Sequence, residues 1–120
     1  MFSSKEKVKV GVVGAGVLGR FHTKLYKENS KAELVGVYDV STGAAKAVGK
    51  EFGVKPFESI AELAAQCDAL TIAVPATEHF ATAMPLIEMG KHLLMEKPLA
   101  ATVTEARELV RAAGAKNIVF

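Results

Sequence analysis

The chain has 120 residues, half of them hydrophobic, and its 15 basic side chains against 13 acidic ones leave a net charge of only +2. This balance is typical of one soluble domain with an ordinary core, and the lack of a concentrated basic block disfavours a nucleic-acid partner. No stretch approaches the ~18 apolar residues of a membrane span, and residues 1–9 lack the apolar core of a signal peptide.

Short apolar runs alternate along the chain with longer segments of helical spacing, a pattern that indicates repeated strand-helix units around a parallel sheet. We predict six strands, at residues 8–13, 34–38, 54–57, 69–74, 92–95 and 118–120. The nearly continuous apolar run at 69–74 suits a strand buried on both faces, whereas Pro56 places the third strand at an edge. The predicted fold class is therefore α/β with a mostly parallel sheet.

Helices are predicted between these strands and after the fifth. The first opens at a glycine cluster and carries Leu18, Phe21 and Leu25 on one apolar stripe. Three others begin at residues that can cap a helix N-terminus, namely Ser41 or Thr42, Ser59 and Thr77, and the last begins at about Thr102. Gly53 and Gly90 are expected to end two of them, and Pro85 to kink or break the fourth.

The single cysteine, Cys67, excludes an internal disulfide and fits a reducing compartment, so we expect a cytoplasmic protein. Because Cys67 lies just ahead of an apolar run, we interpret its side chain as a small buried hydrophobic group rather than a nucleophile. His22, His79 and His92 are scattered, without paired cysteines or carboxylates at ligand spacing, and no metal site is expected.

Gly14, Gly16 and Gly19 form the pattern G-x-G-x-x-G between the first strand and the first helix. The pattern alone is weak, but Asp39 stands about 20 residues later at the end of the second strand, as dinucleotide-binding folds require. Gly14 permits the tight turn, Gly16 lets the backbone approach a pyrophosphate, and Gly19 lets the helix lie close to the strand.

In this interpretation the amides near Val17 and Leu18, at the positive end of the helix, bind the pyrophosphate. Asp39 accepts hydrogen bonds from the hydroxyls of the adenosine ribose. The rival phosphate loop needs a lysine and a metal-binding hydroxyl where this chain has Arg20 and Phe21, which disfavours mononucleotide hydrolysis. A glycine turn that merely packs a helix on a sheet stays open as the alternative.

Two later motifs follow the glycine loop in order: Pro75 with His79 four residues on, after the fourth strand, and Glu96-Lys97-Pro98 after the fifth. With these three motifs, nearly the whole chain closely resembles the Gfo/Idh/MocA oxidoreductases, the family of glucose-fructose oxidoreductase and inositol 2-dehydrogenase. The resemblance implies a nicotinamide-binding Rossmann domain, which is a doubly wound and mostly parallel sheet with strand order 3-2-1-4-5-6. In whole members a mostly antiparallel α/β domain follows and shapes the sugar site, and that second domain is absent from this sequence.

The resemblance also implies roles for individual residues. Lys97 would lie beside the nicotinamide and the reacting hydroxyl as the catalytic residue, and Glu96 would help to position the cofactor or Lys97. The residues that would border the cofactor are Val74, Pro75, Thr77 and His79. Further acid-base residues, commonly an Asp and a His, belong to the missing domain. A lysine in this place can stabilise a developing alkoxide or shuttle its proton.

Ordinary structural roles stand beside these assignments. Lys97 is otherwise a solvated surface lysine before a proline, and His79 an ordinary helix-face histidine. His22 is assigned to packing or to support of the cofactor loop.

The function expected is that of an NAD-dependent dehydrogenase domain which acts, in the complete protein, on a hydroxyl of a sugar, sugar nucleotide or cyclitol. NAD is expected over NADP because Asp39 would face a 2′-phosphate. Residues 1–120 would form one dinucleotide-binding domain, and the apolar ending at residues 118–120 indicates a fragment of a longer enzyme. The resemblance implies that the full-length enzyme forms homo-oligomers.

Two functions of other classes remain open. One is a binding module that senses NAD or NADH without catalysis, against which Lys97 argues, since a sensor needs no amine at the nicotinamide end. The other is a bare structural α/β domain, against which Asp39 argues.

Overall fold

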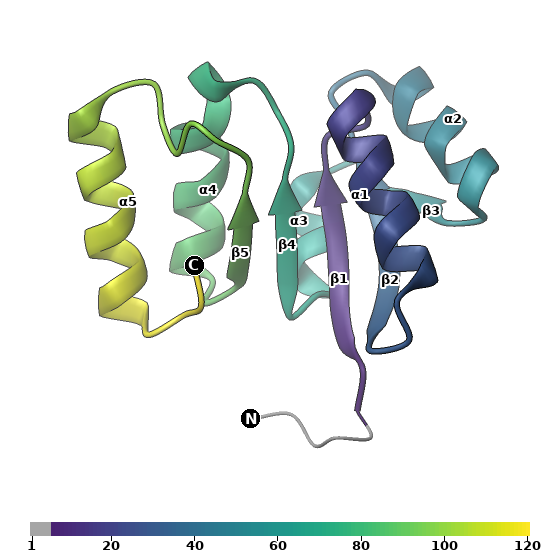
Figure 1. Cartoon of the computed structure of the whole chain (residues 1–120), viewed down its shortest axis with the longest axis horizontal. Helices are drawn as coiled ribbons and strands as arrows, with labels where there is room; N and C mark the ends of the chain where they lie inside the picture. Colours follow the sequence, from purple (N-terminus) through teal and green to yellow (C-terminus); the bar gives the residue numbers. More distant parts are fainter. Residues whose placement is uncertain (1–5) are drawn as a thin grey trace.

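A five-stranded parallel sheet forms the middle layer of the computed structural model, which describes residues 6–120 (Figure 1). The strands are β1 (Val8–Val13), β2 (Ala32–Tyr38), β3 (Lys55–Pro56), β4 (Ala69–Ile72) and β5 (His92–Met95). They lie in the order β3-β2-β1-β4-β5, and every neighbouring pair is parallel. This arrangement confirms the doubly wound α/β fold. Residues 1–5, part of the segment read as lacking a signal peptide, lie outside the described residues.

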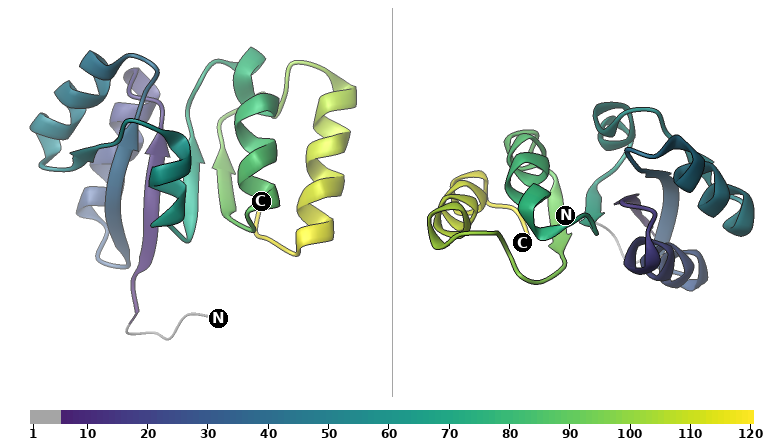
Figure 2. Two further views of the ribbon diagram at one scale, coloured as in Figure 1. Left: turned by 180° about the vertical axis from the view of Figure 1, so that it is seen from behind. Right: turned by 90° about the horizontal axis from the view of Figure 1, so that it is seen from above.

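Helices cover both faces of the sheet. They are α1 (Val17–Glu28), α2 (Thr42–Phe52), α3 (Ile60–Ala65), α4 (His79–Glu88) and α5 (Val103–Lys116). In Figure 1, α1 crosses in front of the sheet and α3 lies behind it, and the turned view of Figure 2 brings α3 to the front. Within residues 6–120, no helix is long and apolar enough to cross a membrane.

The core has two clusters, and the end of β1 contributes to both. Val12 packs in a cluster with Val37 and Val48, whereas Val13 belongs to the larger cluster under α3, α4 and α5, with Leu86 as one member. Successive side chains of a strand point to opposite faces of the sheet, so the two clusters lie on opposite sides. A strand covered on both faces needs apolar residues in sequence, which explains the valine run.

The expected sixth strand at residues 118–120 is not formed, although the segment lies along the edge of β5. The amide of Leu93 donates to the carbonyl of Val119 at 3.0 Å, but the amide of Val119 donates to the Nδ1 atom of His92 at 2.9 Å. The His92 side chain therefore occupies the Val119 amide, which a further hydrogen bond of the sheet would need as its donor. Other strand bounds differ less: β2 begins earlier than predicted, β4 ends at Ile72, and β3 is confined to Lys55–Pro56 at the predicted edge.

The apolar stripe of α1 does not face the sheet. Leu18, Phe21 and Leu25 are about half exposed, while Gly19 and Thr23 are buried against the strands. The reason is the close approach of α1 to the loop after β1: a Cβ atom at residue 19 would overlap the carbonyl oxygen of Gly14. The helix must present its smallest residue there, and this turns the large apolar side chains away from the core.

Three predicted helix starts are confirmed by side-chain caps. The hydroxyl oxygens of Ser41, Ser59 and Thr102 accept hydrogen bonds from backbone amides in the first turn of α2, α3 and α5, at 3.3, 3.0 and 3.1 Å. The prediction for Thr77 is wrong. A 3-10 turn, η1 (Ala76–Glu78), precedes α4, so Thr77 lies inside a turn instead of at a helix start. α4 then runs through Pro85 without a break.

Candidate functional site

A cavity of about 440 Å³ opens at the carboxyl ends of β1, β2 and β4. Its wall is formed by the loops that follow these strands and by residues of α3, η1 and α4. The sheet order changes direction between β1 and β4, and ligands of doubly wound sheets bind in the crevice at this point. Predicted site residues in the wall are Gly14, Gly16, Asp39, Val74 and Pro75.

Gly14 and Gly19 are glycines because the folded chain leaves no room for a side chain. Gly14 has φ +117°, its amide donates to the carbonyl of Tyr38 at 2.7 Å, and a Cβ atom there would overlap the carbonyl oxygen of Ala73. Gly19 lies against Gly14 itself, as described above. These two glycines build the turn that joins β1 to α1.

Gly16 differs from both, because the fold does not require a glycine there. Its φ of −77° suits any residue, and a Cβ atom would meet no protein atom within 4 Å. The residue lies in the cavity wall and is the N-cap of α1, which has no side-chain cap hydrogen bond, unlike α2, α3 and α5. The first-turn amides of α1, from Val17 on, therefore face a space that an anionic group can fill.

Asp39 holds the glycine loop at the end of β2. Its Oδ2 atom accepts a hydrogen bond from the amide of Ala15 at 2.7 Å, and its Oδ1 atom accepts one from the amide of Ser41 at 2.8 Å. Each carboxylate oxygen keeps a further lone pair, so Asp39 can still accept from hydroxyl groups in the cavity. Sequence reasoning missed the contact with Ala15; the bond to Ser41 is an Asx turn, which an aspartate two residues before a serine could have suggested.

Beyond the cavity wall, the other predicted residues lie in α1, in η1, at the start of α4 and on the turn after β5. Val17, 87% exposed, Leu18 and Gly19 belong to the first turn of α1, while Thr77 is exposed in η1. Glu96 and Lys97 follow β5 at the same carboxyl edge of the sheet, on a turn whose Lys97–Pro98 bond is cis. Lining residues that the sequence did not single out as site residues are Val13, Tyr38, Val40, Ile60, Ala73, Glu78 and Thr82.

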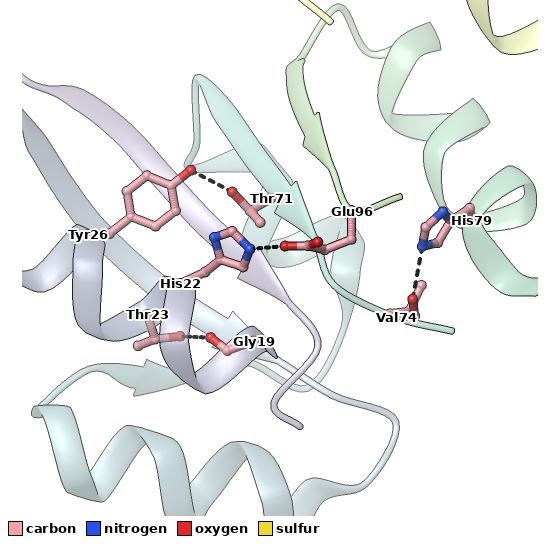
Figure 3. A network of polar contacts seen from close by, with 8 residues as sticks. All are labelled: Gly19, His22, Thr23, Tyr26, Thr71, Val74, His79 and Glu96. Carbon is pink, nitrogen blue, oxygen red and sulfur yellow. Dashed lines mark hydrogen bonds and ion pairs between the residues drawn. The ribbon is translucent and has the colours of Figure 1, made fainter. Parts of the chain in front are cut away.

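His79 is buried, and its ring faces backbone atoms (Figure 3). The Nε2 atom lies 2.9 Å from the carbonyl oxygen of Val74, and Nδ1 lies 3.2 Å from that of Leu99. His22, on α1, pairs through Nε2 with Oε1 of Glu96. Neither histidine belongs to the cavity wall, and each contacts the turn that carries Lys97.

Two groups outside the cavity support the sequence interpretation. Arg20, at the place where a phosphate loop has its lysine, pairs with Glu51 of α2, and this hydrogen-bonded guanidinium holds the pKa of Glu51 below its usual range. Burial raises the pKa of the Cys67 thiol to about 12, as for a hydrophobic side chain rather than a nucleophile. Among residues 6–120, no three His, Cys, Asp or Glu side chains gather to hold a metal ion.

Comparison with known proteins places this geometry in a family. The model of the Gfo/Idh/MocA oxidoreductase family, NAD-binding Rossmann fold, matches residues 8–120. The chain belongs to this family. Membership confirms the resemblance drawn from the glycine loop, the Pro75 motif and the Glu96-Lys97-Pro98 motif. It also explains why the cavity lies at the crevice between β1 and β4.

Relatives in the Gfo/Idh/MocA family include characterised dehydrogenases. UDP-N-acetylglucosamine 3-dehydrogenase of Acidithiobacillus ferrooxidans is 37% identical over 113 residues, which cover 94% of this chain and 36% of that protein. Its solved structure has a TM-score of 0.91 at 35% identity, over 95% of this chain and 37% of that one. Glucose-6-phosphate 3-dehydrogenase of Bacillus subtilis is 39% identical over 98 residues, 82% of this chain and 28% of that protein.

The similar solved structures include complexes with a nicotinamide cofactor. The WlbA dehydrogenase of Bordetella pertussis, in complex with NADH and UDP-GlcNAcA, has a TM-score of 0.88 at 28% identity, over 98% of this chain and 35% of that one. This chain therefore spans about a third of the length of the relatives it matches.

Proposed function

We propose that this chain is the cofactor-binding part of an NAD-dependent dehydrogenase that acts on a hydroxyl of a sugar, sugar nucleotide or cyclitol. The observation that carries the proposal is the open space at Gly16, in the wall of a cavity that Asp39 also lines. The fold does not need a glycine at this position, whereas a pyrophosphate does. Relatives that act on UDP-N-acetylglucosamine and glucose 6-phosphate support the substrate class.

Each part of the chain then has a distinct task. The amides at the start of α1 bind the pyrophosphate, and the Asp39 carboxylate, held by Ala15 and Ser41, accepts from the ribose hydroxyls. The bound NAD supplies the hydride acceptor. Lys97 stabilises negative charge on the substrate oxygen when its side chain is an ammonium group, or accepts the proton of the reacting hydroxyl when its side chain is a neutral amine.

The remaining parts of the proposal concern the longer protein. Substrate positioning belongs to residues outside this chain, since the chain spans about a third of its relatives. We accordingly propose that residues 1–120 are one domain of a two-domain enzyme. Homo-oligomer formation and a cytoplasmic location stay predictions from the sequence.

The test is a substrate panel assayed by NADH absorbance at 340 nm. The natural protein that contains these residues should reduce NAD with at least one sugar, sugar nucleotide or cyclitol. The 120-residue chain alone should bind NAD and catalyse nothing, because positioning of the substrate supplies about 7–11 kcal/mol of the barrier reduction. Substrate-dependent NADH production by this chain alone would contradict the two-domain proposal, and failure of both proteins to bind NAD would contradict the function.

NAD is expected to bind at least about tenfold more tightly than NADP. A 2′-phosphate would meet the Asp39 carboxylate, and two unit charges ~4 Å apart repel by about 4 kcal/mol at an effective dielectric constant near 20, before relaxation. No Arg or Lys occurs at residues 40–45 to offset this repulsion, and Lys46 is the next base along the chain. Titration calorimetry with both cofactors measures the ratio.

The matched control for this preference is Asp39→Asn. The substitution removes the negative charge, so the dissociation constants of NAD and NADP should become more similar. NAD binding should weaken as well. The carboxylate now accepts hydrogen bonds from two backbone amides, and the side-chain NH2 of asparagine would face one of them, donor against donor. Tighter binding of NADP than of NAD by the parent chain would contradict the prediction.

A further inference from the structure

The turn that carries Lys97 has no regular secondary structure of its own. Residues 96–99 form a bend after β5, and Lys97 is exposed. A group that handles a proton during hydride transfer must be held to within about 0.5 Å, and a misplacement of about 1 Å can lower the rate 10²-fold. Contacts at the two ends of the turn must therefore hold it in place.

The N-terminal end of the turn is held from α1. The Nε2 atom of His22 pairs with Oε1 of Glu96, and the two side chains are only 17% and 26% exposed (Figure 3). The Glu96 amide also donates to the carbonyl of Ile72 at 3.2 Å. The helix whose first turn faces the cofactor cavity thus also holds the residue next to Lys97.

The C-terminal end of the turn is held from α4. His79, 1% exposed, lies between the carbonyl oxygens of Val74 and Leu99. Both partners only accept hydrogen bonds, so a ring with one N–H satisfies one carbonyl and a ring with two satisfies both. A ring with two N–H groups joins the turn to the loop after β4, where Val74 lines the cavity, whereas a ring with one N–H donates to one carbonyl and only packs against the other.

We propose that His22 and His79 are positioning residues for Lys97, which fix the two ends of the turn and align it with two walls of the cofactor cavity. The inference rests on the proposed function, because it assumes that Lys97 acts at the reacting hydroxyl. Neither histidine touches substrate or cofactor in this arrangement. Their effect on turnover passes entirely through Glu96 and Leu99.

The experiment uses the natural protein that contains these residues and the best substrate of the panel. His22→Ala should lower kcat about tenfold or more, leave the Kd of NAD within about twofold, and raise the deuterium isotope effect on kcat. His22→Gln places an amide donor near the position of Nε2 and should restore most of the turnover. Lys24→Ala, an exposed change on the same helix, is the matched control and should leave all three measurements unchanged.

His79 is tested with a pair of amide variants. His79→Asn places its donor near Nδ1 and keeps the bond to Leu99, whereas His79→Gln places it near Nε2 and keeps the bond to Val74. The Asn variant should therefore retain more turnover. Because both variants alter a buried residue, the ring protons of His79 in the unaltered protein provide a second measurement, and NMR should find them protected from exchange with water.

The outcomes separate this inference from the proposed function. Unchanged kcat in His22→Ala, in a protein that loses turnover in Lys97→Ala, would overturn the positioning role and keep the function. If His22→Ala lost NAD affinity and kcat together, the positioning role would also be overturned, and His22 would instead support the cofactor loop. Equal turnover in the two folded His79 variants, or rapid exchange of its ring protons, would overturn the role of His79. Undiminished turnover in Lys97→Ala would overturn the proposed function itself.

Discussion

Gly16→Val is expected to weaken NAD binding by at least about a hundredfold, or about 2.8 kcal/mol, while the chain stays folded. A Cβ atom at residue 16 would meet no protein atom within 4 Å, and the φ of −77° suits valine, so we expect the fold to accommodate the substitution. The same branched side chain would occupy the approach of the pyrophosphate to the start of α1. Titration calorimetry measures the binding, and thermal unfolding followed by circular dichroism measures the stability.

The matched control is Gly19→Ala, a smaller change three residues along. Its Cβ atom would overlap the carbonyl oxygen of Gly14, which is backbone and cannot rotate away. We expect this variant to lower the free energy of unfolding by about 1–3 kcal/mol, the usual cost of overpacking. The prediction is contradicted if Gly16→Val binds NAD as the parent chain does, or if it loses more stability than Gly19→Ala.

The sheet could be predicted because its determinants are local. Alternation of apolar runs with helical spacing predicted the five strands of the parallel sheet, and the glycine pattern with Asp39 predicted the crevice. The orientation of α1 could not be predicted from its apolar stripe. It depends on the contact between Gly19 and Gly14, which only the folded chain forms, so Leu18 and Phe21 face outward against the periodicity.

The details of the site depend on distant partners. His22 and Glu96 are 74 residues apart, and His79 and Leu99 are 20 apart, so no local pattern connects them. The caps at Ser41 and Ser59, whose partners are three residues away, were predicted correctly. The cap predicted at Thr77 is wrong, because the carbonyl of Pro75 accepts a hydrogen bond from the Glu78 amide and starts a 3-10 turn there.

Lys97→Ala, in the natural protein that contains this chain, is expected to lower kcat about 10²-fold or more, the usual scale for a positioned acid-base group. The Kd of NAD should stay within about twofold, because Lys97 is exposed and lies outside the wall of the cofactor cavity. Stability should also be unaffected, since truncation of an exposed side chain leaves no buried gap. Steady-state rates at 340 nm and calorimetry make the two measurements.

Lys50→Ala, an exposed lysine in the last turn of α2, is the control for loss of a positive charge, and it should leave both quantities unchanged. The separation between kcat and the Kd of NAD is the decisive part of the prediction. An amine that merely adds positive charge near the cofactor changes binding and turnover together, whereas one that acts only on the reacting oxygen changes turnover alone. Undiminished kcat in Lys97→Ala would make Lys97 an ordinary surface lysine and leave the cavity with a binding role only.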